Sequence, residues 1–159
     1  MSHPYATSAR HRWQQALLAG LGGGLAVGLL ACETETLHWP LLMGSFGSSA
    51  VIVFGFPDSG FSKARNVVGA HVLCVFIGLL CLKLLGPAWW SAGLAVGLCI
   101  AAMIGSRMVH PPAGSNPLLV FALKPGWMFL VSPALLGSLA LVLLAWAWRR
   151  LAPPHRHET

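Results

Sequence analysis

Charged side chains are scarce in this chain of 159 residues, and acidic side chains are the scarcest. It holds ten Lys and Arg against four Asp and Glu, so that 9% of its residues are charged. Soluble domains average about 25%. No paired acids, nucleophile–base arrangement or basic stripe interleaved with aromatic residues is present in the sequence. We therefore expect neither an enzyme with catalytic residues nor a nucleic-acid-binding protein.

Metal-ligand motifs are missing as well. The four cysteines have no C-x-x-C or mixed Cys/His spacing, and they lie in or beside apolar segments, where free cysteine is commonly a small buried residue. We predict no metal site and no cofactor. What the chain has in abundance is apolar sequence, since 56% of its residues are hydrophobic and the mean hydropathy is +0.71. This composition predicts an all-α polytopic membrane protein whose main partner is the lipid bilayer.

Six apolar segments are present, at about 13–32, 40–56, 66–86, 89–109, 114–123 and 128–148. Four of them are long enough to cross a hydrocarbon core of about 30 Å, which takes about 20 helical residues. The segments 40–56 and 114–123 are short and interrupted by Gly, Ser and Pro, so each either spans the membrane or enters it and returns. We expect a transmembrane domain over 13–150, with tails at 1–12 and 151–159.

The distribution of basic residues favours six crossings. With the N-terminus inside, eight of the ten basic residues would be cytoplasmic, and only Lys83 and Lys124 would be outside. If the second short segment or both short segments only dip into the membrane, the division falls to six against four. We therefore expect both termini in the cytoplasm, in a multi-pass protein of the bacterial inner membrane. The eight residues are Arg10, Arg12, Lys63, Arg65, Arg107, Arg149, Arg150 and Arg156.

The sequence also contains an internal repeat. Gly24–Leu29 recurs unchanged as Gly93–Leu98, and Gly47-Ser48 recurs as Gly114-Ser115, at offsets of 69 and 67. The unit is helix, broken segment, helix, over about 13–86 and about 89–150. Because three crossings are an odd number, the two repeats would be inverted, as in many secondary transporters. Gly20, Gly24 and Gly28, spaced by four, are interpreted as a helix-packing face.

The second broken segment starts at His110-Pro111-Pro112, where two prolines end a helix. A new helix is expected from Asn116-Pro117, with Asn116 as its N-cap and Pro117 at the first helical position. Helix N-termini carry unpaired N–H groups and partial positive charge, so two of them converging at mid-depth favour a small inorganic anion. His71 and His110 are candidates for a proton relay. The predicted substrate-binding residues are Gly47, Ser48, Ser49, His110, Gly114, Ser115 and Asn116.

The residues Ser45–Ala50, Ala64–His71 and His110–Gly114 together resemble the HPP family of small integral membrane proteins. The likeness extends over roughly 13–150, but Ser59–Asn66 and Ser115-Asn116 depart from the family pattern. Cyanobacterial and chloroplast members are known as nitrite transporters, so the resemblance implies nitrite as the anion. The family is usually described with four transmembrane helices, whereas the residues of this chain indicate six.

The sequence is compatible with two other functions. A structural or regulatory membrane subunit would use the same small residues for packing, and a channel for a neutral small solute would need similar interrupted helices. The sequence does not distinguish import from export, a channel from a proton-coupled carrier, or a monomer from a homodimer. It also leaves open which small oxyanion is the substrate.

Overall fold

The computed structural model describes residues 9–36, 38 and 40–151, and this part of the chain is helical without any strand. The predicted all-α class is confirmed. Of the predicted tails, 1–8 and 152–159 lie outside the described residues. The six α-helices are α1 (Ala9–Thr36), α2 (Ser45–Gly55), α3 (Ala64–Leu85), α4 (Trp89–Gly105), α5 (Asn116–Leu123) and α6 (Leu136–Leu151). The short turns are η1 (Gly60–Ser62), η2 (Pro111–Ser115), η3 (Trp127–Leu130) and the π-helical η4 (Val131–Leu135).

Three stretches of helix are long and apolar enough to cross a membrane: His11–Thr36, Ala64–Leu85 and Trp127–Leu151. The apolar helices α2 and α4 are shorter, and α5 has eight residues. At a rise of 1.5 Å per residue, α2 is about 17 Å long and α5 about 12 Å. These lengths are about half or less of a hydrocarbon core of about 30 Å. Each therefore needs the non-helical residues before it to complete a crossing.

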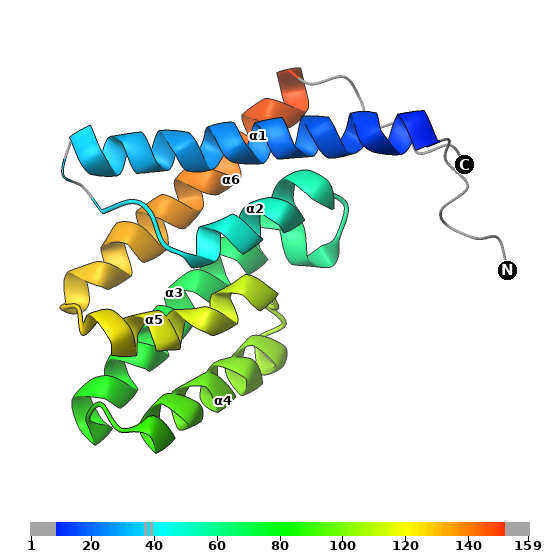
Figure 1. The fold of residues 1–159 in the computed structure, drawn as a ribbon. Helices are drawn as coiled ribbons and strands as arrows, with labels where there is room; N and C mark the ends of the chain where they lie inside the picture. The colour runs from blue at the N-terminus through cyan, green and yellow to red at the C-terminus, as the bar shows by residue number, and fades with distance from the viewer. Residues whose placement is uncertain (1–8, 37, 39, 152–159) are drawn as a thin grey trace, which may run out of the picture.

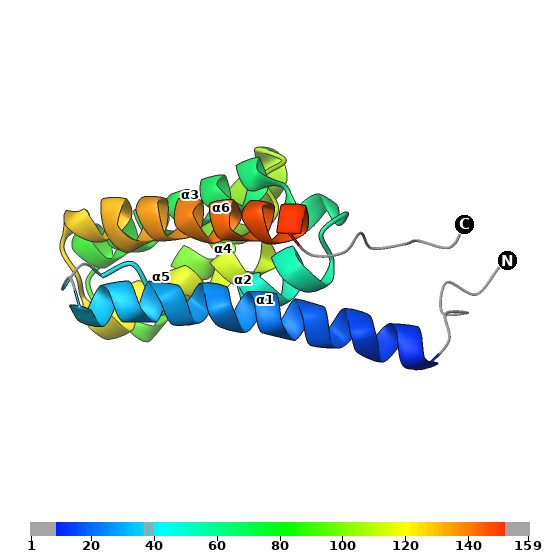
Figure 2. The same cartoon turned by 90° about the horizontal axis from the view of Figure 1, so that it is seen from above.

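Corresponding helices of the two repeats run in opposite directions. Figure 1 and Figure 2 show α1, α3 and α5 running one way along the long axis of the molecule and α2, α4 and α6 running back. Thus α1 opposes α4, α2 opposes α5, and α3 opposes α6. This is the arrangement expected when a unit of three crossings is repeated.

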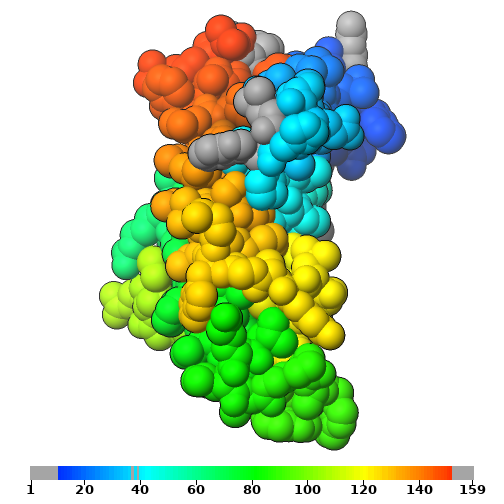
Figure 3. Space-filling model, turned by 90° about the vertical axis from the view of Figure 1, so that its left-hand side faces the viewer, coloured from blue at the N-terminus to red at the C-terminus, as the bar shows by residue number. Residues whose placement is uncertain are grey.

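The helices pack as two groups that do not coincide with the two repeats. The first group consists of α1, α2 and α6, and the second of α3, α4 and α5 (Figure 1). Each repeat therefore contributes its third helix to the other group. In the space-filling view of Figure 3, the end of α6, in red, and the α3–α4 turn, in green, lie at opposite extremes.

Close packing in the first group depends on glycines other than the expected ones. A Cβ at Gly22 would meet Trp148 and Phe54, and a Cβ at Gly137 would overlap the Leu41 carbonyl oxygen and the Phe46 ring. Gly20, Gly24 and Gly28 have no atom within 4 Å of such a Cβ. Their interpretation as a packing face within this chain was wrong, because they lie on the opposite side of α1 from its contacts with α2 and α6.

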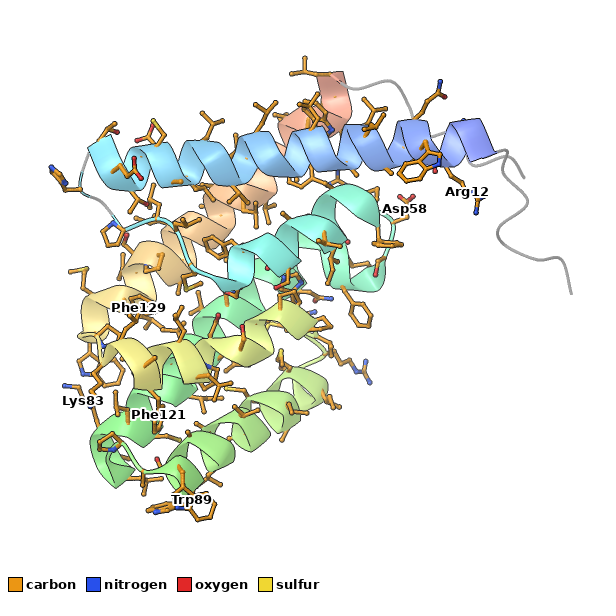
Figure 4. The ribbon with its side chains drawn as sticks, in the orientation of Figure 1. Arg12, Asp58, Lys83, Trp89, Phe121 and Phe129 are labelled. Atoms are coloured by element: carbon orange, nitrogen blue, oxygen red, sulfur yellow. The ribbon has the colours of Figure 1, made fainter. Side chains whose placement is uncertain are left out.

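Charged residues gather at the two ends of the molecule. One end carries Arg12 and Asp58, and the other carries Lys83 (Figure 4). The first end also holds the start of α3, the end of α4 and the end of α6, and thereby most of the basic residues. The opposite end holds Glu33 and Glu35 in the last turns of α1. The helix directions thus gather most of the described basic residues at one end of the molecule.

Candidate functional site

Four buried polar side chains meet where the two helix groups touch, and we call them the polar cluster: Ser49, His71, His110 and Asn116. Each has 0% of its surface exposed. They come from the second turn of α2, the second turn of α3, the bend after α4 and the first residue of α5. Ser49 and His110 are 61 residues apart in sequence, and His71 and Asn116 are 45 apart. The tertiary fold alone brings them together.

Local sequence positions each of these side chains. His110 is extended, with φ −137° and ψ 98°, because a residue that precedes proline is disfavoured in the helical region. Pro111 and Pro112 then start the η2 turn, which leads directly into α5 and places Asn116 at its first position. On α2, Ser45 and Ser49 lie one turn apart on the same buried face.

Ser49 Oγ is the centre of the polar cluster. It lies 3.0 Å from His71 Nε2, 2.8 Å from His110 Nε2 and 3.0 Å from the carbonyl oxygen of Ser45. The outer ring nitrogens are also engaged: His110 Nδ1 lies 2.9 Å from the Phe61 carbonyl oxygen, and His71 Nδ1 lies 2.9 Å from Asn116 Nδ2. Both imidazoles are therefore hydrogen-bonded at both ends.

These partners assign the tautomers of two neutral imidazoles. A carbonyl oxygen only accepts, so His110 Nδ1–H donates to Phe61, and His110 Nε2 accepts from the Ser49 hydroxyl. At the other end, the Asn116 amide donates to His71 Nδ1, so His71 Nε2–H donates to Ser49 Oγ. All donors then point the same way, from Asn116 toward Phe61. The Ser45 carbonyl is an alternative acceptor for the Ser49 hydroxyl hydrogen.

A buried aromatic ring packs against the polar cluster. Phe46 is fully buried and stands edge-on to His71, with ring centroids 5.0 Å apart, and the two imidazole centroids are 5.3 Å apart. The described partners of the four side chains are one another and backbone carbonyls, so the cluster has no charged partner among them.

Two buried polar atoms on the segments that form the site have no hydrogen-bond partner among the described residues. They are Asn116 Oδ1 and Ser45 Oγ. Asn116 uses its amide nitrogen twice, toward His71 Nδ1 and, at 3.4 Å, toward the His71 carbonyl oxygen. Its own oxygen is left as an unused acceptor. Buried unpaired polar groups are uncommon and costly, so these atoms mark a place where a ligand or water would gain hydrogen bonds.

Of the predicted site residues, Ser49, His110 and Asn116 come together, and they do so around His71. Ser48 and Ser115 do not join them. Both are exposed, and their hydroxyls donate to the carbonyl oxygens of Ser45, at 2.9 Å, and Pro112, at 2.8 Å. Gly47 is exposed and Gly114 is half-buried, with Met103 as the neighbour that a Cβ there would meet.

The helix N-termini contribute to the site differently from the prediction. Asn116 was expected to cap α5, but it is the first helical residue, and its side chain reaches His71 instead. Its backbone N–H already bonds the Ala113 carbonyl, and Pro117 has no N–H. On α2, the Phe46 N–H bonds the Met43 carbonyl. The polar groups of this site are therefore side chains more than free backbone amides.

Two groups that contact the polar cluster, Ser45 and the Phe61 carbonyl oxygen, were not predicted from the sequence. The spacing of Ser45 and Ser49 by one helical turn is a signal that could have identified Ser45. No sequence signal identifies the Phe61 carbonyl, because any residue type supplies a backbone oxygen.

The cysteines on α3 and α4 form a separate, buried region. Cys74, Cys81 and Cys99 are free thiols, and Cys99 Sγ donates to the Cys74 carbonyl oxygen at 3.6 Å. Cys74 and Cys99 pack with Ala70 and Met103 in the core between α3 and α4. Among the described residues, no group of three or more His, Cys, Asp or Glu side chains is arranged to hold a metal ion.

Basic side chains lie near the bend that carries His110. Arg65, in the first turn of α3, donates to the Ser106 carbonyl oxygen at 3.3 Å, and Arg107 follows in a left-handed conformation with φ 55°. Lys63 precedes α3 directly. These three cations lie at the same end of the molecule as η1, whose Phe61 carbonyl accepts from His110.

Comparison with known proteins identifies relatives of this chain. A family model described as the HPP transmembrane region matches residues 8–158. Two transmembrane proteins of Dictyostelium discoideum are each 32% identical to it. One aligns over 121 residues, covering 71% of this chain and 38% of the relative, and the other over 137 residues, covering 80% and 48%. The chain thus spans less than half the length of these relatives. No solved structure matches it.

Proposed function

Because the chain belongs to the HPP family of transmembrane proteins, we propose that it moves a small inorganic anion across the membrane, with nitrite as the first candidate. The observation that carries the proposal is the polar cluster. A membrane protein that keeps four polar side chains fully buried between apolar helices has a functional reason to do so, since such residues are costly in the bilayer and characteristic of substrate pathways.

The position of the polar cluster supports a transport site. In transporters built from inverted repeats, the substrate site lies near mid-depth, where interrupted helices of the two repeats meet. Here Ser49 and Asn116 come from the two short helices, and 116 minus 49 gives the offset of 67 that relates Gly47-Ser48 to Gly114-Ser115. Two equivalent positions of the repeats thus contact the same histidine, His71.

The charge distribution supports a small anion. Lys63 and Arg65 lie at the start of α3 and Arg107 lies after α4, near the bend that carries His110, and cations so placed raise the local concentration of anions. We propose that this end lies on the cytoplasmic side of a bacterial inner membrane, because cytoplasmic loops are enriched in Lys and Arg. The proposal assigns the chain no chemical reaction, metal or cofactor.

The test is nitrite uptake into liposomes that contain the purified full chain, with protein-free liposomes to correct for permeation of nitrous acid. Wild type should exceed that background, and Ser49→Ala and Asn116→Leu should reduce the excess at least tenfold. Ser48→Ala is the matched control, since Ser48 is the neighbouring serine on the exposed side of α2. If wild type moves neither nitrite nor a related oxyanion, the chain is better explained as a structural or regulatory subunit.

A channel for a neutral small solute is the second candidate, and one observation favours it. The polar cluster offers hydrogen-bond donors and acceptors but no charged side chain among its described partners. The two candidates differ in their response to voltage. Flux of a neutral solute is independent of membrane potential, and it should appear as solute-dependent swelling of the same liposomes.

A further inference from the structure

We propose that the polar cluster carries a proton together with the anion, so that the transported pair has no net charge, and that His110 Nε2 holds this proton. The inference rests on the proposed transport function and specifies its coupling. It follows from three features of the cluster: its lack of a fixed counter-charge, the unpaired oxygen of Asn116, and hydrogen bonds around Ser49 that can all be made with or without one additional proton.

The first feature concerns charge. The described partners of the polar cluster are neutral side chains and backbone carbonyls, and its walls include the buried Phe46. An isolated anion in such surroundings would lose its hydration without gaining an opposite charge, which is strongly unfavourable. An imidazolium formed on His110 supplies that opposite charge at the moment the anion arrives.

The second feature is the unpaired Asn116 Oδ1. A carbonyl oxygen repels a bare anion, but it accepts a hydrogen bond from a hydroxyl group. A protonated oxyanion, with one O–H donor and at least one acceptor oxygen, would pair with this atom. When the proton passes from His110 Nε2 to the bound oxyanion, the O–H so formed can donate to Asn116 Oδ1, so the site is matched to an anion and a proton together.

The third feature is that the network accommodates the added proton. In the neutral state, the Ser49 hydroxyl donates to His110 Nε2. When a proton from water binds His110 Nε2, the Ser49 hydroxyl hydrogen rotates to the Ser45 carbonyl oxygen, 3.0 Å away, and Ser49 Oγ accepts from both imidazoles. Release of the proton to water on the other side restores the first state. One proton and one monovalent anion cross per cycle, and no other bond changes.

The surroundings of His110 limit which other group could accept the proton. The titratable side chain that faces it is His71 on α3, while α2 presents Ser49, η1 presents the Phe61 carbonyl and η2 begins with two prolines. The nearby cations are Arg65 and Arg107, at the ends of α3 and α4. His71 Nδ1 accepts from the Asn116 amide, whereas the Ser49 hydroxyl that donates to His110 Nε2 can turn to the Ser45 carbonyl oxygen, so His110 Nε2 is the ring nitrogen that can accept a proton.

The test measures how nitrite accumulation depends on voltage and on a pH gradient, in liposomes with the full chain. For a bare anion, an inside-negative potential of 100 mV lowers the equilibrium accumulation about fifty-fold, since 59 mV corresponds to a factor of ten. For the coupled pair, voltage should have no effect, and a tenfold higher proton concentration outside should raise accumulation about tenfold. Both are measured above protein-free liposomes, with internal pH followed by a trapped dye.

The outcomes separate the two proposals. No protein-dependent nitrite uptake overturns both. Uptake that follows voltage and ignores the pH gradient overturns the coupling and leaves anion transport standing. His110→Gln keeps a polar side chain without a site for the proton, so it should abolish the response to the pH gradient, whereas His38→Gln, at an exposed histidine, should preserve it. A full response in His110→Gln overturns the assignment to His110, and the wild-type measurement decides the coupling even if that variant does not fold.

Discussion

Replacement of Ser49 by alanine removes the atom to which both imidazoles are hydrogen-bonded. Ser49 Oγ lies 3.0 Å from His71 Nε2 and 2.8 Å from His110 Nε2, and the cavity left by one oxygen gives neither nitrogen a new partner. In a soluble protein, each buried group left unpaired costs about 1–3 kcal/mol. We expect Ser49→Ala to lower the free energy of unfolding.

In a membrane protein, the loss of unfolding free energy caused by Ser49→Ala should be smaller than in a soluble protein. Hydrogen bonds between transmembrane helices average about 0.6 kcal/mol and reach about 1.7 kcal/mol, because the unfolded state in lipid also finds partners. Two such bonds are lost here, so the expected loss is about 1–3 kcal/mol. Ser48→Ala has the same change in helix propensity on the same helix and should stay within about 0.5 kcal/mol of wild type.

The assay is reversible unfolding of the purified chain in mixed micelles, followed by tryptophan fluorescence. The two variants share the substitution and the helix, and Ser48→Ala removes only a bond to the Ser45 carbonyl, so a larger loss of stability in Ser49→Ala reports the imidazole contacts. If Ser49→Ala and Ser48→Ala have equal stabilities, the cluster is not held by Ser49, and the reasoning from these distances is refuted.

Three further predictions concern packing, backbone and orientation. In the same assay, Gly137→Ala should lower the free energy of unfolding by about 1–3 kcal/mol, because the new Cβ would overlap the Phe46 ring. Gly24→Ala, whose Cβ meets open space, should leave the free energy of unfolding unchanged or raise it by up to about 1 kcal/mol. Lys124→Gly should raise it by up to about 1 kcal/mol, since Lys124 ends α5 in a left-handed conformation with φ 48°; a lower stability would argue against that backbone. In a background without native cysteines, Ser59→Cys and Lys124→Cys should react with a membrane-impermeant maleimide from opposite sides of the membrane. Labelling of both variants from the same side would contradict six crossings.

The apolar segments of the sequence predicted the six helices well, because length and hydropathy dominate helix formation in a bilayer. Their boundaries were predicted less well near prolines and bends. The segment 89–109 contains α4 only to Gly105, after which Arg107 turns the chain with positive φ. The segment 128–148 was expected to be one helix, but Ser132-Pro133 interrupts it, and α6 begins at Leu136.

The polar cluster was predicted in part. An ionisable residue in an apolar segment identified His71, and the double proline drew attention to His110. The sequence could not tell which of the adjacent Ser48 and Ser49 faces inward, because neighbouring residues on a helix differ by about 100°. It also could not pair Ser49 with His110, since that contact depends on how the two helix groups pack and not on local spacing.

The division into two helix groups indicates what a transport cycle would have to change. In the first group, Ser49 on α2 is the side chain that contacts both imidazoles, while His71 and Asn116 belong to α3 and α5 of the second group, and His110 joins α4 to η2. Sliding or rocking of the groups would therefore break the two Ser49–imidazole bonds and leave the His71–Asn116 pair intact. At about 0.6 kcal/mol each, with an upper value near 1.7 kcal/mol, these bonds are weak enough to break during turnover. They are also directional, so they re-form in one arrangement. A single serine whose hydroxyl responds to protonation of His110 would thus link the protonation state of the cluster to the contact between the groups.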